Sequence, residues 1–511
     1  MTDTEFDTFT VSPMDEYNQK LVSQVHPPDW VNPTPADCYD LVVIGAGTAG
    51  LVTAAGAAGL GLGFKIALVE RSLMGGDCLN VGCVPSKAMI RSSRVVADIA
   101  NARKYGIVAP DSVTVDFPAV MERMRRIRSQ ISPHDSAQRF QNLGIDVFLG
   151  NGAFTANDTV RVGETELRYK KAVIATGARA VRPNIEGLEA AGYLTNETVF
   201  NLTERPPRLA VIGGGPIGCE LAQMFQRLGS QVTLIHRHSH LLHREDAEAA
   251  EIVQQQFLCE GIQLRLDAQP IRVDSRDGKK VIFLEGGEAI DVDEILVSAG
   301  RTPNIEGLSL DVVGVKHSNK GIIVNDNLQT SNAKIFAAGD VCTNWKFTHA
   351  ADAAARIVIQ NTLFAPFGLG RAKLSDLVMP WVTYTDPEVA HVGLYEAEAR
   401  SQGIDTQTIE IPFRGLDRAI TDGETEGLLK ILHVKGSDKI LGATLVSRHA
   451  GETISQLTTA IVHNIGLKQL ASVIHPYPTQ AECIKKAADA YKKTQLTPFT
   501  QWLLSVLHRF S

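Results

Sequence analysis

The chain has 511 residues, which at roughly 150 residues per domain predicts about three domains. A net charge of −7 argues against nucleic-acid binding as the main activity, and seven cysteines are too few and odd in number for a disulfide scaffold. The acidic N-terminus lacks a signal-peptide pattern, and no run is long and apolar enough for a membrane span. We therefore expect a protein of the reducing cytoplasm.

Residues 1–39 show no clear pattern of secondary structure. Prolines break helices, and this segment contains Pro27, Pro28, Pro33 and Pro35. We interpret the segment as an N-terminal extension or linker.

A strand, a glycine-rich turn and a helix follow directly. The run LVVIGAGTAG precedes a small-residue helix and the strand KIALVE, which ends at Glu70. This order is typical of a dinucleotide-binding βαβ unit. Gly45 would make the tight turn, Gly47 would let the backbone approach a pyrophosphate, and Gly50 would let the helix pack on the strand. Glu70 would accept hydrogen bonds from ribose hydroxyls.

A second unit of the same kind begins with LAVIGGGPIG, which supplies Gly213, Gly215 and Gly218, and continues to the strand QVTLI. Two such motifs together predict two bound nucleotides. The second strand is followed by HRHSHLLHR instead of an acid. Because an arginine accommodates a 2′-phosphate, we favour NADPH over NADH, with Arg237 as the main contact and His236 beside it. A metal site built from these histidines and a solvated polar loop remain alternatives.

The segment GGDCLNVGCVPSKAM contains two cysteines, Cys78 and Cys83, separated by four residues. Pro85 suits the first turn of a helix, so both thiols are expected near a helix N-terminus, where the dipole lowers a cysteine pKa. A zinc site would need two further ligands at suitable spacing, and none is evident. We predict a redox-active dithiol/disulfide.

This segment resembles the active-site motif of the FAD-dependent pyridine nucleotide–disulfide oxidoreductases. KAVIATGARA (Thr176, Gly177), LVSAGRTPN (Arg301), IFAAGDV (Gly339, Asp340) and TYTDPEVAHVG resemble further motifs of that family. The resemblance implies an α/β fold with two Rossmann-like domains, for FAD and NADPH, and an α+β C-terminal dimerisation domain. It divides the chain into residues 1–39 (extension), 40–186 and 298–372 (the two parts of the FAD domain), 187–297 (NAD(P)H domain) and 373–511 (dimerisation domain with an apolar tail).

The resemblance also implies roles for matched residues. Cys78 resembles the interchange thiol that faces substrate, and Cys83 resembles the thiol that stacks against the flavin. Lys87 and Glu220 resemble the pair beside flavin N5. Glu70 would hold the adenosine ribose of FAD, and Asp340 would bind the ribityl chain, in a homodimer whose active site is shared between subunits.

One motif departs from the family pattern. Many disulfide-reducing members carry a catalytic histidine in a His-Pro-Thr-x-x-Glu motif, whereas IHPYPTQAE places Tyr477 at that position, five residues before Glu482, with His475 two residues early. Tyrosine is less acidic than histidine by roughly 3.5 pKa units, or about 5 kcal/mol, and is a poor base at neutral pH. The mercuric reductase branch resembles this chain here, because its members carry a tyrosine that handles Hg(II).

The sequence therefore predicts a mercuric-reductase-like enzyme in which Cys78 and Cys83 bind Hg(II) transiently. That branch ends in a vicinal cysteine pair, which the tail TPFTQWLLSVLHRFS lacks, and often has an N-terminal metal-binding domain, which is also missing. Two alternatives are a reductase of a low-molecular-weight disulfide, with His475 as the base, and a redox-sensing flavoprotein with little turnover.

Three further expectations concern residues outside these motifs. The remaining cysteines of the patterned segments are expected to be packed: Cys219, Cys259, Cys342 and Cys483. The tail from Pro498 to Phe510 shows helical spacing of apolar residues and is expected to dock on its own protein. An arginine cluster is expected to form a solvated helix face: Arg123, Arg125, Arg126 and Arg128.

Overall fold

The structure is a computed structural model that describes residues 10–110, 113–276 and 278–509. The chain divides into two compact units. Unit 1 comprises the described residues up to Gly213, Met224–Val232 and Pro270–Leu377. Unit 2 comprises Gly214–Gln223, Thr233–Gln269 and the described residues from Val378 onward.

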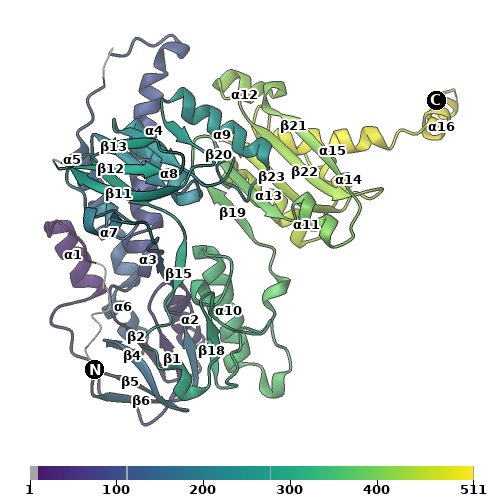
Figure 1. The fold of residues 1–511 in the computed structure, drawn as a ribbon. Helices are drawn as coiled ribbons and strands as arrows, with labels where there is room; N and C mark the ends of the chain where they lie inside the picture. The colour runs from purple at the N-terminus through teal and green to yellow at the C-terminus, as the bar shows by residue number, and fades with distance from the viewer. Residues whose placement is uncertain (1–9, 111–112, 277, 510–511) are drawn as a thin grey trace. The chain divides into compact units, whose positions relative to one another are not determined.

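The main sheet of unit 1 has the strand order β3-β2-β1-β6-β5-β4, and β18 also pairs with β6 (Figure 1). Strands β3, β2, β1, β6 and β18 form parallel pairs, whereas β4, β5 and β6 are antiparallel. The bounds are β1 Tyr39–Ile44, β2 Ile66–Glu70, β3 Ile145–Leu149, β4 Gly152–Ala156, β5 Thr159–Val162, β6 Thr165–Ile174 and β18 Ile335–Ala337. The nearly continuous apolar runs of β1 and β2 are typical of parallel strands buried on both faces.

The side chains of this sheet alternate between two apolar clusters, of which the first includes the helices and the second is formed by strands and the segment around Leu308–Ile322. Leu41 and Val43 of β1 belong to one cluster, and Val42 and Ile44 belong to the other. Helix α10 packs against α2 in the first cluster. The helices of this part are α2 Thr48–Ala58, α3 Gly76–Asn80, α4 Cys83–Ala100, α5 Phe117–Ile131, α6 Ala137–Asn142 and α10 Thr348–Leu363.

The N-terminal segment contains a helix that the sequence analysis did not predict, α1 Glu16–Val25. The four prolines lie after this helix and leave it intact. Asp15 caps its first turn by accepting a hydrogen bond from the backbone of Asn18 at 2.9 Å. Leu21 and Val25 are fully buried in the core of unit 1, so this part of the segment is packed structure and not a linker.

The second nucleotide-binding motif folds as predicted into a strand, a helix and a strand. Its sheet has the order β10-β9-β8-β14, and the neighbouring sheet has the order β11-β12-β13. The bounds are β8 Arg208–Ile212, α8 Pro216–Arg227, β9 Gln231–Ile235, α9 Ala247–Cys259, β10 Gln263–Arg265, β11 Pro270–Arg276, β12 Lys279–Leu284, β13 Ala289–Val292 and β14 Glu294–Val297. Short elements complete unit 1: α7 Leu188–Ala191, β7 Ala178–Ala180, β15 Arg301–Pro303, β16 His317–Ser318 and β17 Gly321–Ile322.

The C-terminal part of unit 2 is an antiparallel sheet with the order β19-β20-β23-β22-β21 (Figure 1). Its strands are β19 Pro380–Thr383, β20 Glu388–Gly393, β21 Thr406–Pro412, β22 Leu428–Val434 and β23 Ile440–Ser447. Its helices are α11 Glu396–Ser401, α12 Asp417–Asp422, α13 Ala450–Val462, α14 Leu467–Leu470 and α15 Glu482–Thr494. Together the units give the mixed α/β architecture that the sequence predicts.

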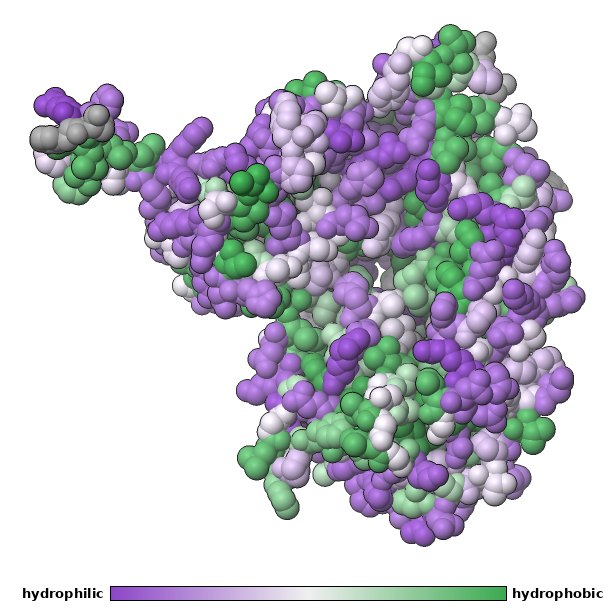
Figure 2. Space-filling model, turned by 180° about the vertical axis from the view of Figure 1, so that it is seen from behind, coloured by the Kyte–Doolittle hydropathy of each residue, from purple (hydrophilic) through white to green (hydrophobic). Residues whose placement is uncertain are grey.

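The apolar tail forms a helix, α16 Pro498–His508, as its helical spacing predicts. None of its described side chains is buried, and Trp502 is 58% exposed. Figure 2 shows these apolar residues at the molecular surface. The periodicity therefore predicted the helix correctly, and its docking on this protein stays a prediction. No helix within the described ranges is long and apolar enough to cross a membrane.

The other cysteines divide by burial. Cys219 and Cys483 are fully buried, as predicted, and Cys342 is half-buried. Cys259 is exposed, which contradicts the expectation, because it lies at the end of α9.

Candidate active site

The two cysteines lie at the junction of two helices in unit 1, in a segment that we call the redox loop, residues 76–83. Cys78 is inside the short helix α3, and Cys83 is the first residue of the 18-residue helix α4. Pro85 lies in the first turn of α4, as predicted. The two side chains are within hydrogen-bonding distance and are thiols, not halves of a disulfide. The predicted pair is therefore brought together by the fold.

The expectation that both thiols have a lowered pKa is wrong for Cys78. Its hydrogen bond to Cys83, its burial and the negative charge of Cys83 raise the pKa of Cys78. Helix α3 has five residues, so its dipole is small compared with these effects.

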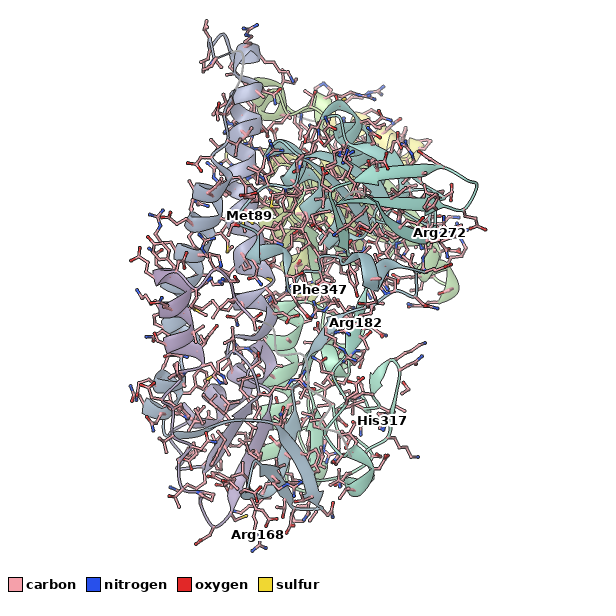
Figure 3. The ribbon with its side chains drawn as sticks, turned by 60° about the vertical axis from the view of Figure 1, so that its left-hand side comes forward. Met89, Arg168, Arg182, Arg272, His317 and Phe347 are labelled. Carbon is pink, nitrogen blue, oxygen red and sulfur yellow. The ribbon has the colours of Figure 1, made fainter. Side chains whose placement is uncertain are left out.

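Thr348 is a residue of this site that the sequence analysis missed. Its hydroxyl lies 3.3 Å from Sγ of Cys83. Thr348 is the first residue of α10, and Phe347, labelled in Figure 3 with Met89 of α4, directly precedes it. It lies 265 residues from Cys83 along the chain, so no local spacing could have indicated the contact.

The first glycine turn has the geometry of a nucleotide cradle. Gly45 has φ +102°, and a Cβ there would lie 2.4 Å from the carbonyl oxygen of Ala175. A Cβ on Gly50 would lie 1.7 Å from the carbonyl oxygen of Gly45. A Cβ on Gly47 would meet its nearest neighbour only at 3.8 Å, and within the described structure no side chain caps α2. Packing therefore requires Gly45 and Gly50, whereas the space at Gly47 fits an approaching pyrophosphate.

Glu70 is 9% exposed and binds the same turn. Its two carboxylate oxygens accept hydrogen bonds from the backbone of Ala46 at 2.6 Å and of Ser72 at 2.7 Å. Burial raises the pKa of Glu70, while these two hydrogen bonds oppose the rise. Glu70 thus has a structural role in holding the turn, and its predicted contact with a ribose stays a prediction.

Arg301 connects the second flavin motif to the redox loop. Its guanidinium forms an ion pair with Asp77, next to Cys78, and lies 3.6 Å from the carboxylate of Asp340. Burial lowers the pKa of Arg301, but Asp77 and Asp340 outweigh this effect and raise it. Burial also raises the pKa of Asp340. Arg301 and Asp340 are predicted site residues, but their approach to each other and the ion pair with Asp77 were not predicted.

The two predicted connections between the flavin and nicotinamide parts lie side by side. Strand β7 follows Gly177, and it pairs antiparallel with β15, which begins at Arg301. The hydroxyl of Thr176 donates to the carbonyl of Asn304 at 2.6 Å, and the Asn304 side chain donates back to the carbonyl of Thr176. Gly177 has φ +69° and Gly339 has φ +80°, conformations that favour glycine.

The second glycine turn repeats the geometry of the first. Gly213 has φ +117°, and a Cβ there would lie 2.6 Å from the carbonyl oxygen of Ser298. A Cβ on Gly215 would have no described heavy atom within 4 Å. Gly218 lies in the first turn of α8. Packing within the described structure therefore does not require a glycine at the central position of either motif, Gly47 or Gly215. This is expected where a ligand approaches the backbone.

Three of the four histidines after β9 form a cluster in unit 2. Ring nitrogens of His236, His238 and His243 all lie within 4.8 Å of one another. His240 instead bonds the carbonyl of Leu241. The guanidinium of Arg237 donates to Nε2 of His238 at 3.2 Å. The arrangement has the spacing of a metal site, so the protonation of His236 decides what it can bind.

The free ring nitrogen of His236, Nε2, carries a hydrogen and so offers a donor instead of a lone pair. The backbone N–H of Gly214 donates to its Nδ1 at 3.0 Å, so in the neutral ring Nε2 carries the hydrogen. Burial and the neighbouring cationic groups lower the pKa of His236 to about 4, which keeps it neutral at pH 7. Its Nε2 is buried and has no partner among the described residues. A buried, unpaired donor suits an anionic or ribose oxygen better than a cation.

Lys87 and Glu220 belong to different units. Lys87 lies one turn after Cys83 in α4. Glu220 lies in α8, is buried, and accepts a hydrogen bond from the backbone of Tyr384 at 2.9 Å within unit 2. Their pairing beside a flavin stays a prediction.

The departing motif lies between α14 and α15. Tyr477 is 71% exposed and donates to Asp417 at 2.9 Å, and this hydrogen bond raises the pKa of Tyr477. Both ring nitrogens of His475 are engaged, one with Gln456 at 2.9 Å and one with the carbonyl of Val473 at 3.3 Å. Glu482 is the first residue of α15.

The arginine cluster of α5 is not a solvated face, contrary to expectation. Arg125 and Arg128 are buried, Arg123 donates to the carbonyl of Ala88 at 2.7 Å, and only Arg126 is exposed. The signal was present in the sequence: Phe117, Met121, Met124 and Arg128 follow helical spacing, so Arg128 shares the buried face.

Comparison with known proteins decides the family. The pyridine nucleotide-disulphide oxidoreductase model matches residues 39–355, and the dimerisation domain of the same family matches residues 379–488. The chain belongs to the pyridine nucleotide-disulphide oxidoreductases. It is 35% identical to a mercuric reductase of Staphylococcus aureus over 459 residues, covering 89% of this chain and 83% of the relative. It is 33% identical to a dihydrolipoyl dehydrogenase of Chlamydia muridarum, covering 88% of this chain and 96% of the relative.

Solved structures agree with this family. The HOCl-induced flavoprotein disulfide reductase RclA of Escherichia coli matches with a TM-score of 0.78 and 28% identity, covering 88% of this chain and 99% of that one. The family uses FAD and NAD(P)H, as predicted. The protein is therefore a flavoprotein oxidoreductase, and its dimerisation domain supports a homodimer.

Proposed function

We propose that this oxidoreductase uses NADPH and FAD to reduce the Cys78–Cys83 pair, and that Hg(II) is its acceptor. FAD would be held by the turn at Gly45–Gly50, by Glu70 and by Asp340. When bound, it supplies the chemistry that accepts a hydride from NADPH and passes two electrons onward. The remaining steps depend on the chain's own residues.

The cysteine pair supports a soft acceptor. Two sulfurs within hydrogen-bonding distance can bind one Hg(II), and thiolates are the ligands that soft ions prefer. In the proposed arrangement Cys78 faces the acceptor, and Cys83 faces the flavin. Thr348 lies 3.3 Å from Sγ of Cys83 and can donate a hydrogen bond to the thiolate.

The observation that carries the choice of acceptor is Tyr477 and its bond to Asp417. Because this bond raises a pKa that is ordinarily about 10, Tyr477 is not a base at neutral pH. Reduction of Hg(II) to Hg(0) consumes two electrons and no proton. Reduction of a disulfide consumes two electrons and two protons and needs an acid–base group. Tyr477 therefore fits the reduction of Hg(II), which needs no acid–base group, better than the reduction of a disulfide.

The preference for NADPH rests on His236 and Arg237. His236 offers a buried N–H with no described partner, and Arg237 lies directly beside it with a permanent positive charge. A 2′-phosphate satisfies both groups. The same proposal divides the chain into residues 40–186 and 298–372 for FAD, 187–297 for NADPH and 373–511 for dimerisation. In it the active site is shared between two subunits, and the protein lies outside any membrane.

The test is NADPH oxidation by the FAD-loaded enzyme, measured in parallel with Hg(II), lipoamide, oxidised glutathione and a quinone. We expect turnover with Hg(II), loss of it in Cys78→Ser and Cys83→Ser, and little change in Cys259→Ser. Cys259 is the matched control because it is exposed but lies in α9, away from the redox loop in sequence. If Cys259→Ser loses as much Hg(II)-dependent NADPH oxidation as the other two variants, the activity depends on nonspecific thiol binding and not on the Cys78–Cys83 pair.

A second candidate is the reduction of a low-molecular-weight disulfide. The similarity to a dihydrolipoyl dehydrogenase and to a flavoprotein disulfide reductase favours it. Here His475 would act as the acid–base group, after releasing Gln456. Fast turnover with a disulfide that His475→Ala abolishes would replace the mercuric proposal. Flavin reduction by NADPH with no turnover on any acceptor would instead indicate a redox sensor.

A further inference from the structure

A buried chain of hydrogen bonds joins the N-terminal helix α1 to the redox loop. Arg128 of α5 donates through Nη2 to the side-chain oxygen of Asn18 and through Nη1 to the carbonyl oxygen of Asn80, each at 2.6 Å. All three residues are fully buried. Asn80 lies between Cys78 and Cys83, so the N-terminal segment reaches the candidate redox centre through a single guanidinium.

The same face of α5 holds α1 at a second point. Asp15, which caps α1, accepts a hydrogen bond from Nε of Arg125 at 2.5 Å. Arg125 and Arg128 are three residues apart and so lie on one face of α5. The start of α1 is therefore fixed by two arginines, one of which also contacts the loop.

The end of α1 holds the chain that enters the loop. The carbonyl of Val25 accepts a hydrogen bond from the backbone of Met74 at 3.0 Å, and His26 bonds the carbonyl of Ser72 at 2.5 Å. The Asn80 side chain donates to the carbonyls of Met74 and Gly76 at 3.0 and 2.9 Å. The loop is thus fixed at its entry by α1 and in its middle by Arg128.

Apolar packing alone does not explain this arrangement. Nε of Arg128 and Oδ1 of Asn80 are buried without a partner among the described residues. Burying a guanidinium with an unsatisfied N–H costs free energy, which an apolar side chain at the same position would avoid. Burial lowers the pKa of Arg128 only to about 10, so it stays charged at neutral pH.

We propose that α1 and Arg128 position the redox loop, and that Arg128, through the carbonyl of Asn80, fixes the geometry in which one sulfur of Cys78 and Cys83 can donate a hydrogen bond to the thiolate of the other. Asn18 orients Arg128, and Arg128 acts through the carbonyl of Asn80. These are positioning residues that need not touch the acceptor. The inference rests on the proposed role of Cys78 and Cys83 as the redox pair.

The test compares Arg128→Met, Asn18→Ala and Arg126→Met in the FAD-loaded enzyme. Methionine keeps much of the length of arginine without its charge, and Arg126 is the exposed control on the same helix. The reduced enzyme is alkylated with iodoacetamide across a pH series, because only thiolate reacts, and folding is followed by circular dichroism. We expect Arg128→Met to move the midpoint of the pH profile upward by about one unit, or about tenfold less thiolate at a given pH below it.

Asn18→Ala should move the midpoint in the same direction by less, and Arg126→Met should not move it. A folded Arg128→Met with the wild-type profile would overturn the positioning role, because a structural role alone would lower stability and leave the profile in place. If Arg128→Met does not fold, Asn18→Ala serves as the test, and a folded Asn18→Ala with the wild-type pH profile would likewise overturn the positioning role. Failure of the underlying redox function is separate: it would appear as a wild-type pair that does not exchange between dithiol and disulfide in a glutathione redox buffer.

Discussion

The guanidinium of Arg301 lies against the carboxylate of Asp77, the residue directly before Cys78. The same guanidinium also faces Asp340, which the resemblance assigns to the flavin ribityl chain. One half-buried cation thus balances two acidic groups, one in the redox loop and one in the predicted flavin motif. This explains why an arginine stands at the start of β15.

Arg301→Met should therefore destabilise unit 1. It leaves the half-buried carboxylates of Asp77 and Asp340 without their cation, which should cost about 2 kcal/mol, between the values typical of exposed and of buried ion pairs. We expect a lower thermal midpoint and loss of bound FAD, measured by differential scanning fluorimetry and by flavin absorbance after gel filtration. Arg356 is the control, because its pair with Asp352 is exposed, and Arg356→Met should change stability by less than about 1 kcal/mol. Equal effects of both variants would contradict this account.

The glycines of the first turn should separate folding from cofactor binding. Gly45→Ala and Gly50→Ala place a Cβ within 2.4 and 1.7 Å of a backbone oxygen, so we expect misfolded or aggregated protein. Gly47→Ala meets its nearest neighbour only at 3.8 Å, so the protein should fold but retain little FAD. Circular dichroism and flavin content measure the two effects. A Gly47→Ala variant with full FAD content would show that no pyrophosphate approaches this residue.

The buried His391 should make unit 2 sensitive to acid. Burial lowers its folded-state pKa to about 4, whereas an unfolded histidine has a pKa near 6.5. Between pH 6.5 and 4 the unfolded chain therefore binds a proton that the folded chain does not, so this contribution to stability is present above pH 6.5 and is lost as the pH falls. The loss amounts to about 3 kcal/mol at most. Thermal unfolding measured from pH 7.5 to 5 should show this loss as a falling thermal midpoint, and the midpoint of His391→Gln should fall less steeply with pH. If the midpoint of His391→Gln falls as steeply as that of the wild type, other groups cause the acid sensitivity.

His236 and Arg237 should determine coenzyme affinity. His236→Phe keeps a buried ring of similar size but removes the N–H donor, so we expect the KM for NADPH to rise about tenfold with little change in kcat. Arg237→Met should narrow the preference for NADPH over NADH. His240→Ala is the control, because His240 lies in the same segment but outside the cluster. An NADH preference that Arg237→Met does not affect would contradict the assignment.

The tail should be removable without cost to folding. No described side chain of α16 is buried in this chain. The free energy of unfolding of a chain ending at Gln495 should therefore differ by less than about 0.5 kcal/mol from that of the full-length protein. Chemical denaturation of the two forms measures the difference. A clear loss of stability would show that α16 packs against protein.

The nucleotide motifs and the helix at Cys83 could be predicted because their geometry depends on residues close together in sequence. Gly45 and Gly213 adopt positive φ values where the turn needs them, and Pro85 lies in the first turn of α4 as expected. The predictions that were wrong concern which residues contact one another in the folded chain. Arg128 was expected in solvent because a run of arginines usually faces water, whereas Asn18 and Asn80 receive its hydrogen bonds. Helix α1 was missed because the prolines that follow it dominate the composition of its segment.

The sequence by itself determined the two glycine cradles, the cysteine pair and the departure at Tyr477, because each is a pattern of residue types at short, fixed spacing. Only the tertiary structure decided which distant side chains meet them: Thr348 at Cys83, Arg301 at Asp77, and Asn18 through Arg128 at Asn80. It also decided the raised pKa of Cys78, because burial and a second sulfur act on that thiol more strongly than the dipole of a five-residue helix. These contacts follow from how helices pack on a sheet, which spacing along the chain does not encode.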